Sequence, residues 1–78
     1  MKIAYIEWLD SSILGNENIA IADLNKMNGE RLFTAGILIS ADAQAVRIAQ
    51  DVYENGEMCR TIEVIPRVVI TKFKEIDL

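Results

Sequence analysis

The second half of the chain consists of short apolar runs separated by polar or glycine-containing breaks. The runs are Thr34–Ser40, Ala45–Gln50, Met58–Ile65 and Arg67–Phe73, and the breaks fall at 41–44, Asn55-Gly56 and Pro66. Short β-prone runs with turn residues at close spacing are typical of a small β-barrel or β-sandwich. The pattern therefore predicts an all-β fold.

The first apolar run, Lys2–Leu9, reads as a strand with apolar side chains on both faces. Ile3, Tyr5 and Leu9 point one way, and Ala4, Ile6 and Trp8 point the other. A strand with one face in water alternates apolar and polar residues, so this strand is expected to be covered on both sides. One cover would be the core of the domain, and the other would be the following segment or a second subunit.

The segment from Asp10 to Arg31 is the least regular part of the chain. Turn residues at 15–18 and 28–29 flank 21–27, which could form one or two helical turns. Long loops in small domains often carry binding residues. Four apolar residues of this segment instead favour its packing as a cover over the rest of the domain: Ile19, Ile21, Leu24 and Met27.

The segment 41–54 is ambiguous. Ser40 could cap a helix that ends at Asn55-Gly56, and this alternative predicts an α+β fold. In favour of a strand, Val46 and Ile48 alternate with Arg47, and the flanking runs are strongly β-prone. We predict a strand here and keep the helix as the alternative.

Length and composition point to one small domain, 1–78, with marginal stability of its own. Cys59 is the only cysteine and sits in an apolar run, which indicates a buried thiol and a reducing compartment. No charged leader precedes a long apolar stretch, so we expect a cytoplasmic protein without an export signal or a membrane span.

The charge and the side-chain inventory disfavour several functions. A net charge of −4 lacks the basic footprint of a nucleic-acid binder. The chain has no histidine, the commonest general base and transition-metal ligand. Asp23 with Glu17, or Asp51 with Glu54, lacks the spacing of a calcium loop. We therefore expect no enzymatic activity, no metal and no cofactor.

Four short motifs can be compared with a known group of proteins. They are Trp8-Leu9-Asp10-Ser11, Thr34-Ala35-Gly36-Ile37-Leu38, Val46-Arg47-Ile48-Ala49-Gln50 and Val64-Ile65-Pro66-Arg67 with Ile70. In order and spacing they resemble small proteins of tailed bacteriophages and integrated elements, which have a Trp-x-Asp start and a late Ile-Pro-basic signature. The match covers most of the chain outside 12–33, where that group commonly has a second tryptophan and this chain has none.

The resemblance implies a small five-stranded SH3-like or Sm-like barrel with a long first loop. The proline would introduce a single 3₁₀ turn before the last strand. The resemblance also implies a phage or mobile-element setting, but it brings neither an established activity nor a catalytic residue.

Five residues are candidates for ligand binding. Trp8 and Asp10 share a face of the first strand, where an aromatic ring beside a carboxylate could hold a base or ring; alternatively, Asp10 satisfies the indole N–H within the core. Arg47, Arg60 and Arg67 lie in or next to strands of an acidic chain and need anionic partners. Those partners are internal carboxylates such as Glu63 or Asp51, a phosphate-bearing ligand, or an acidic neighbouring subunit.

These observations favour a non-catalytic binding protein. We expect a homo-oligomer that sequesters a small anionic ligand, such as a nucleotide immune signal, at a subunit junction in a counter-defence role in the host cell. One alternative is a small acidic inhibitor of a host defence complex, similar to anti-CRISPR proteins. The other is an Sm-like nucleic-acid-binding module, which the negative net charge disfavours.

Overall fold

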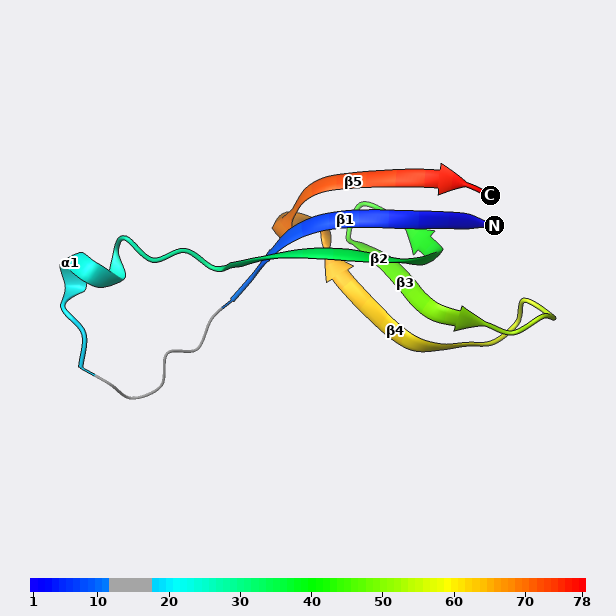
Figure 1. Ribbon diagram of the computed structural model, residues 1–78, viewed down its shortest axis with the longest axis horizontal. Coiled ribbons are helices and arrows are strands. Elements are labelled where there is room, and N and C mark those ends of the chain that lie inside the picture. The colour runs from blue at the N-terminus through cyan, green and yellow to red at the C-terminus, as the bar shows by residue number, and fades with distance from the viewer. Residues whose placement is uncertain (12–17) are drawn as a thin grey trace.

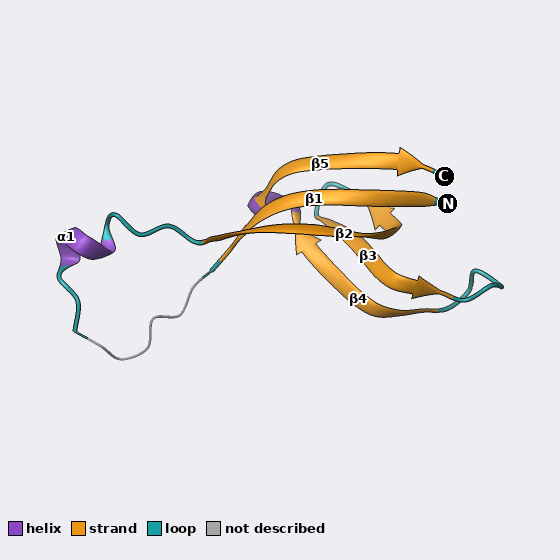
Figure 2. Ribbon diagram, in the orientation of Figure 1, coloured by secondary structure: helices purple, strands orange, loops and turns teal. Residues whose placement is uncertain are grey.

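The computed structural model describes residues 1–11 and 18–78 and has a mainly β fold. Its elements are β1 (Lys2–Asp10), α1 (Ile21–Leu24), β2 (Glu30–Ala41), β3 (Ala45–Val52), β4 (Cys59–Pro66), the 3₁₀ turn η1 (Arg67–Val69) and β5 (Ile70–Asp77). All neighbouring strands are antiparallel and form one sheet of order β4-β3-β2-β1-β5 (Figures 1 and 2). The four ladders confirm an all-β fold. They do not include a pairing between β4 and β5, so closure into a barrel stays a prediction.

The long strand β2 joins the two halves of the sheet. Its first part pairs with β1, from Glu30 opposite Asp10 to Ile37 opposite Ile3. Its last part pairs with β3, from Ile37 opposite Ala49 to Ala41 opposite Val46. The β2–β3 ladder has a register shift between Leu38 and Ser40.

The segment 45–52 is a strand, as predicted, and the helical alternative for 41–54 is wrong. Strand pairing outweighs the amphipathic helical pattern of this segment, because β3 is hydrogen-bonded on both sides, to β2 and to β4. Such a central strand satisfies its backbone groups while burying four side chains of this run, Ala45, Val46, Ile48 and Ala49.

The core lies on one face of the sheet. Its fully buried cluster is Ala4, Ile6, Val46, Ile48 and Ile65, against which Trp8, Leu38, Val69, Ile70 and Phe73 pack. Val69 and Ile70 face the core, whereas Val68 is 93% exposed. The 3₁₀ turn predicted after Pro66 is present, and it carries the chain from β4 into β5.

Gly36 allows a close approach between β2 and β3. A Cβ at this position would lie 3.2 Å from the Ala49 carbonyl oxygen and 3.3 Å from the Ile48 Cβ. A glycine inside a strand often marks such a close approach of two backbones.

Residues 19–27 form an arm that extends away from the sheet (Figure 1). The helical turn predicted in 21–27 is present as α1. The predicted packed cover is wrong, because its four apolar residues are exposed: Ile19 42%, Ile21 77%, Leu24 48% and Met27 49%. Pairing of β1 with β2 continues to Asp10 and Glu30, so the arm leaves the body at the end of a ladder and does not fold back over it.

Candidate functional site

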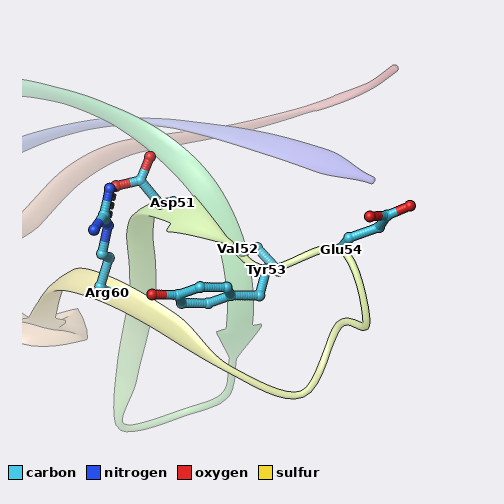
Figure 3. A pocket seen from close by; sticks show the side chains of 5 residues that line it. All are labelled: Asp51, Val52, Tyr53, Glu54 and Arg60. Carbon is cyan, nitrogen blue, oxygen red and sulfur yellow. Dashed lines mark hydrogen bonds and ion pairs between the residues drawn. The ribbon is translucent and has the colours of Figure 1, made fainter.

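A shallow hollow of about 340 Å³ lies beside the β3–β4 hairpin and is the candidate functional site (Figure 3). Its lining residues are Asp51, Val52, Tyr53, Glu54 and Arg60. Strand pairing sets Asp51 opposite Arg60, and the Tyr53 side chain extends back toward Arg60 while Glu54 points away. The hollow therefore combines an exposed aromatic ring with charges of both signs.

The guanidinium of Arg60 is already paired. Its Nε donates to Asp51 Oδ2 at 2.9 Å, and both side chains are more than half exposed. This confirms the interpretation in which an internal carboxylate is the partner of Arg60. Exposed ion pairs contribute little to stability, typically about 0–1 kcal/mol, so the pair serves mainly to orient the two groups.

The hairpin tip is acidic. Between Asp51 and Arg60 the chain carries three carboxylates, those of Asp51, Glu54 and Glu57, and one guanidinium. One carboxylate neutralises Arg60, which leaves Glu54 and Glu57 as net negative charge beside Tyr53. The electrostatics of this tip favour a cationic group over an anion.

Backbone hydrogen bonds hold the tip in one conformation. The Tyr53 N–H donates to the Met58 carbonyl at 2.9 Å, and the Gly56 N–H donates to the Tyr53 carbonyl at 2.8 Å. The Asn55 side chain accepts from the Glu57 N–H at 2.9 Å. Gly56 has φ 75°, which a residue without a Cβ adopts freely, so the predicted Asn55-Gly56 turn is confirmed.

Backbone strain lies next to this hollow. Thr61 has φ 56°, in the left-handed region that β-branched residues rarely adopt. A conformation of this kind costs on the order of 1–3 kcal/mol and is found most often at functional sites. Thr61 follows Arg60 directly, so the strained position adjoins the residue that orients the hollow.

Trp8 and Asp10 each bond to a different partner. The Trp8 indole Nε1 donates to Thr34 Oγ1 at 2.9 Å, and the ring packs against the core. Asp10 instead accepts from the Ser11 backbone N–H at 2.9 Å. The predicted pairing of the indole with Asp10 is therefore wrong, because Thr34 lies on the neighbouring strand β2, opposite Ile6 on the same face as Trp8.

Arg47 is paired with Asp42, a partner that the sequence pattern did not indicate. Its Nη1 donates to Asp42 Oδ2 at 2.9 Å and lies 3.3 Å from Ser40 Oγ. The expected partners, Asp51 and Glu63, are not involved: Asp51 pairs with Arg60, and Asp42 is brought close by the β2–β3 turn. Arg47 thus stabilises a turn.

Asp42 organises that turn. Its Oδ1 accepts from the backbone N–H groups of Ala45 at 2.9 Å and Gln44 at 2.8 Å. These bonds, in that order of importance, followed by the bond from Arg47, lower the pKa of Asp42 from 3.8 to about 2. The predicted break at 41–44 is therefore a side-chain-capped turn.

Arg67 joins the same turn to the 3₁₀ segment. Its backbone N–H donates to the Gln44 carbonyl at 2.9 Å, and its Nε donates to the Asp42 carbonyl at 2.8 Å. Its guanidinium also stacks over the Phe73 ring, 5.0 Å from the centroid. The two hydrogen bonds and the stacking contact are all internal, so the arrangement gives Arg67 a structural role.

The three arginines predicted as one ligand-binding group are consequently not gathered at one place. Arg47 and Arg67 meet at the β2–β3 turn around Asp42, and Arg60 lies at the hairpin with Asp51. Tyr53 and Glu57 were missed by sequence reasoning, and Glu54 was considered there only with Asp51 as a cation site. The sequence does contain a signal for them, because one tyrosine and several acidic residues flank Asn55-Gly56. The sequence pattern was interpreted at this point only as a turn.

We expect the stability contributed by Asp42 to depend on acid pH. A carboxylate whose pKa falls from 3.8 to about 2 on folding stabilises the fold fully above pH 4 and loses this effect as the pH falls toward 2. Asp42→Asn should therefore melt at a lower temperature than the natural protein at pH 7, and the gap should narrow between pH 4 and pH 2. Thermal unfolding followed by circular dichroism measures this, with Asp77→Asn as a control for the loss of one charge. A gap that stays constant down to pH 2 would contradict the assignment.

No family model, curated protein or solved structure matches this chain. The resemblance to phage proteins stays a prediction. Within residues 1–11 and 18–78, no three carboxylate or thiol side chains lie close enough together to hold a metal ion. In the same residues no helix has the length and apolar character needed to cross a membrane.

Proposed function

We propose that this protein is a non-catalytic binding module that docks on a basic surface of another protein through its acidic β3–β4 hairpin. The observation that carries the proposal is the hollow at the hairpin, where Tyr53 is 52% exposed beside carboxylates that outnumber the single guanidinium. An aromatic side chain in a preformed hollow is a typical anchor of a protein–protein interface.

The charges around Tyr53 suit a basic partner. Asp51 neutralises Arg60 at 2.9 Å, so the remaining charge is that of Glu54 and Glu57. Complementary charge at the rim of an interface accelerates association and selects the partner more than it adds affinity. The internal hydrogen bonds of the tip reduce the conformational entropy that binding has to remove.

Sequestration of a small anionic ligand has less support from the geometry. Arg47 and Arg60 each hold a carboxylate at 2.9 Å, which a phosphate would have to replace. At the hairpin, such a ligand would also be repelled by Glu54 and Glu57. The exposed Tyr53 and the acidic hairpin fit a small acidic inhibitor of a host complex better. The phage setting rests on the resemblance alone.

Chemical-shift mapping of the ¹⁵N-labelled protein separates the two functions. The probes are a lysine- and arginine-rich decapeptide and ATP, added to separate samples. We expect the peptide to move the amide signals of 51–60, with an effect that declines at high salt because the attraction is electrostatic. We expect ATP to leave the signals around Arg47 and Arg60 in place.

Matched variants test which groups bind the peptide. Tyr53→Ala should weaken peptide binding about tenfold or more, and Glu54→Gln several-fold, as is typical of an anchor and a rim charge. Asp77→Asn removes the same charge on β5 and should change little. Shifts caused by ATP, abolished in Arg47→Ala and Arg60→Ala, would instead support the anionic-ligand function and overturn this one.

A further inference from the structure

The monomer exposes much more surface than its mass requires. Its accessible surface is 6132 Å², whereas a compact monomer of 8.8 kDa exposes about 4,800 Å². Its radius of gyration is 16.2 Å, against about 11–12 Å for a compact domain of this length. The surplus of about 1,300 Å² exceeds the roughly 800 Å² that each partner buries in a standard interface.

Part of this surplus comes from the arm, defined here as Ile19–Met27. Ile21 and Leu24 lie one helical turn apart on α1 and are 77% and 48% exposed. Ile19 and Met27, at the two ends of the arm, are also exposed. Since α1 lies far from the sheet along the longest axis (Figure 1), the arm has no apolar surface of its own body within reach.

A second apolar surface crosses the sheet on the face opposite the core. Strand register places one row of residues side by side over all five strands, and we call it the outer row: Ile76, Ile3, Ile37, Ala49 and Ile62. Ala4 and Ile48 are in the core, so their neighbours in the row point away from it. The ends of the row are open, with Ile76 47% and Ile62 57% exposed, whereas Ile3 and Ile37 are partly buried and Ala49 is fully buried.

Polar groups next to the outer row are already satisfied by one another. The Tyr5 hydroxyl donates to Glu7 Oε2 at 2.8 Å, which raises the pKa of Tyr5. Glu7 also lies 3.4 Å from Arg31 and 4.0 Å from Lys72. Covering this face would therefore leave few unpaired charges. The exposed Lys74, opposite Tyr5, suits the single charge of α1, Asp23.

We propose that two copies of this chain exchange arms, so that the arm of each copy packs on the outer row of the other. The two surfaces match in chemistry, lie on the same chain, and do not meet within one copy (Figure 1). A reciprocal exchange uses both surfaces of both chains and closes at two subunits.

Sedimentation velocity at micromolar concentration tests the exchange. The natural protein should have twice the chain mass of 8.8 kDa. The double variant Ile21→Ser with Leu24→Ser, in the arm, and the variant Ile62→Ser, in the outer row, should each raise the dimer dissociation constant at least about tenfold. Val68→Ser is the matched control, because Val68 is an exposed apolar residue outside both surfaces. Circular dichroism shows whether each variant is folded.

Mixing the arm variant with the outer-row variant provides the decisive measurement. Each variant alone has no intact arm–row contact, but a mixed dimer has one, formed by the arm of the outer-row variant and the outer row of the arm variant. We expect the mixture to form dimers at concentrations where each variant alone is monomeric. A natural protein that stays at 8.8 kDa, an arm variant that still dimerises, or a mixture without recovery would each overturn the proposal.

Discussion

Replacement of Ile48 with alanine is expected to lower the free energy of unfolding by about 2–5 kcal/mol. Ile48 is 1% exposed and packs in the cluster that joins β1, β3 and β4. Its truncation removes buried methyl groups and leaves a cavity that the small core cannot fill. Small domains have only about 5–15 kcal/mol of stability in total, so the variant should be partly unfolded at moderate temperature.

Urea denaturation followed by the fluorescence of Trp8, the only tryptophan, measures this loss at a fixed protein concentration. Val68→Ala serves as the control, because Val68 is 93% exposed and its substitution should change the free energy of unfolding by less than about 0.5 kcal/mol. Ile37→Ala should cost less than Ile48→Ala, since Ile37 lies in the outer row. Equal losses of unfolding free energy for Ile48→Ala and Val68→Ala would show that β3 does not contribute to the core.

The sequence pattern predicted the strands well because local and long-range preferences agree there. β-branched runs, Asn55-Gly56 and Pro66 each favour the conformation that the structure has. At 41–54 local propensity and strand pairing disagreed, and pairing on both sides of β3 decided the outcome. A single sequence cannot weigh such non-local contacts against a helical stripe.

The arm could not be predicted from its composition. Ile19, Ile21, Leu24 and Met27 show that the segment needs an apolar cover, but they do not show whether the cover belongs to the same chain. The deciding feature is the continuation of the β1–β2 ladder to Asp10 and Glu30, which carries the segment away from the sheet.

The side-chain pairings could also be predicted only in part from the sequence. Asp51 opposite Arg60 follows from hairpin register and was among the expected partners. The pairing of Arg47 with Asp42 depends on a turn whose geometry is set by side-chain capping, and the pairing of Trp8 with Thr34 depends on the register of β1 against β2. Sequence spacing identifies residues on one strand face but not their neighbours on the next strand.

Trp8→Ala is expected to cost about 3–5 kcal/mol of unfolding free energy, the typical loss for a large aromatic residue packed against a core. The variant loses the packing of the ring against the core cluster and leaves Thr34 Oγ1 without its donor at 2.9 Å. Trp8→Phe keeps most of the packing and removes the hydrogen bond, so it should cost less. Asp10→Asn should stay within about 0.5 kcal/mol, because Asp10 is exposed and bonds only to Ser11 among the residues 1–11 and 18–78.

Far-UV circular dichroism in urea measures all three variants, since two of them lack the tryptophan. We expect Trp8→Ala to lose the most unfolding free energy, Trp8→Phe less and Asp10→Asn the least. This order is expected because Trp8 packs against the core and Asp10 does not. A different order would contradict the structural role of Trp8. If Trp8→Ala and Asp10→Asn both left the unfolding free energy unchanged, the indole and the carboxylate would be free to act together on a bound ring. Because Trp8 donates a hydrogen bond to Thr34, we expect Trp8→Ala to destabilise the fold more than Asp10→Asn.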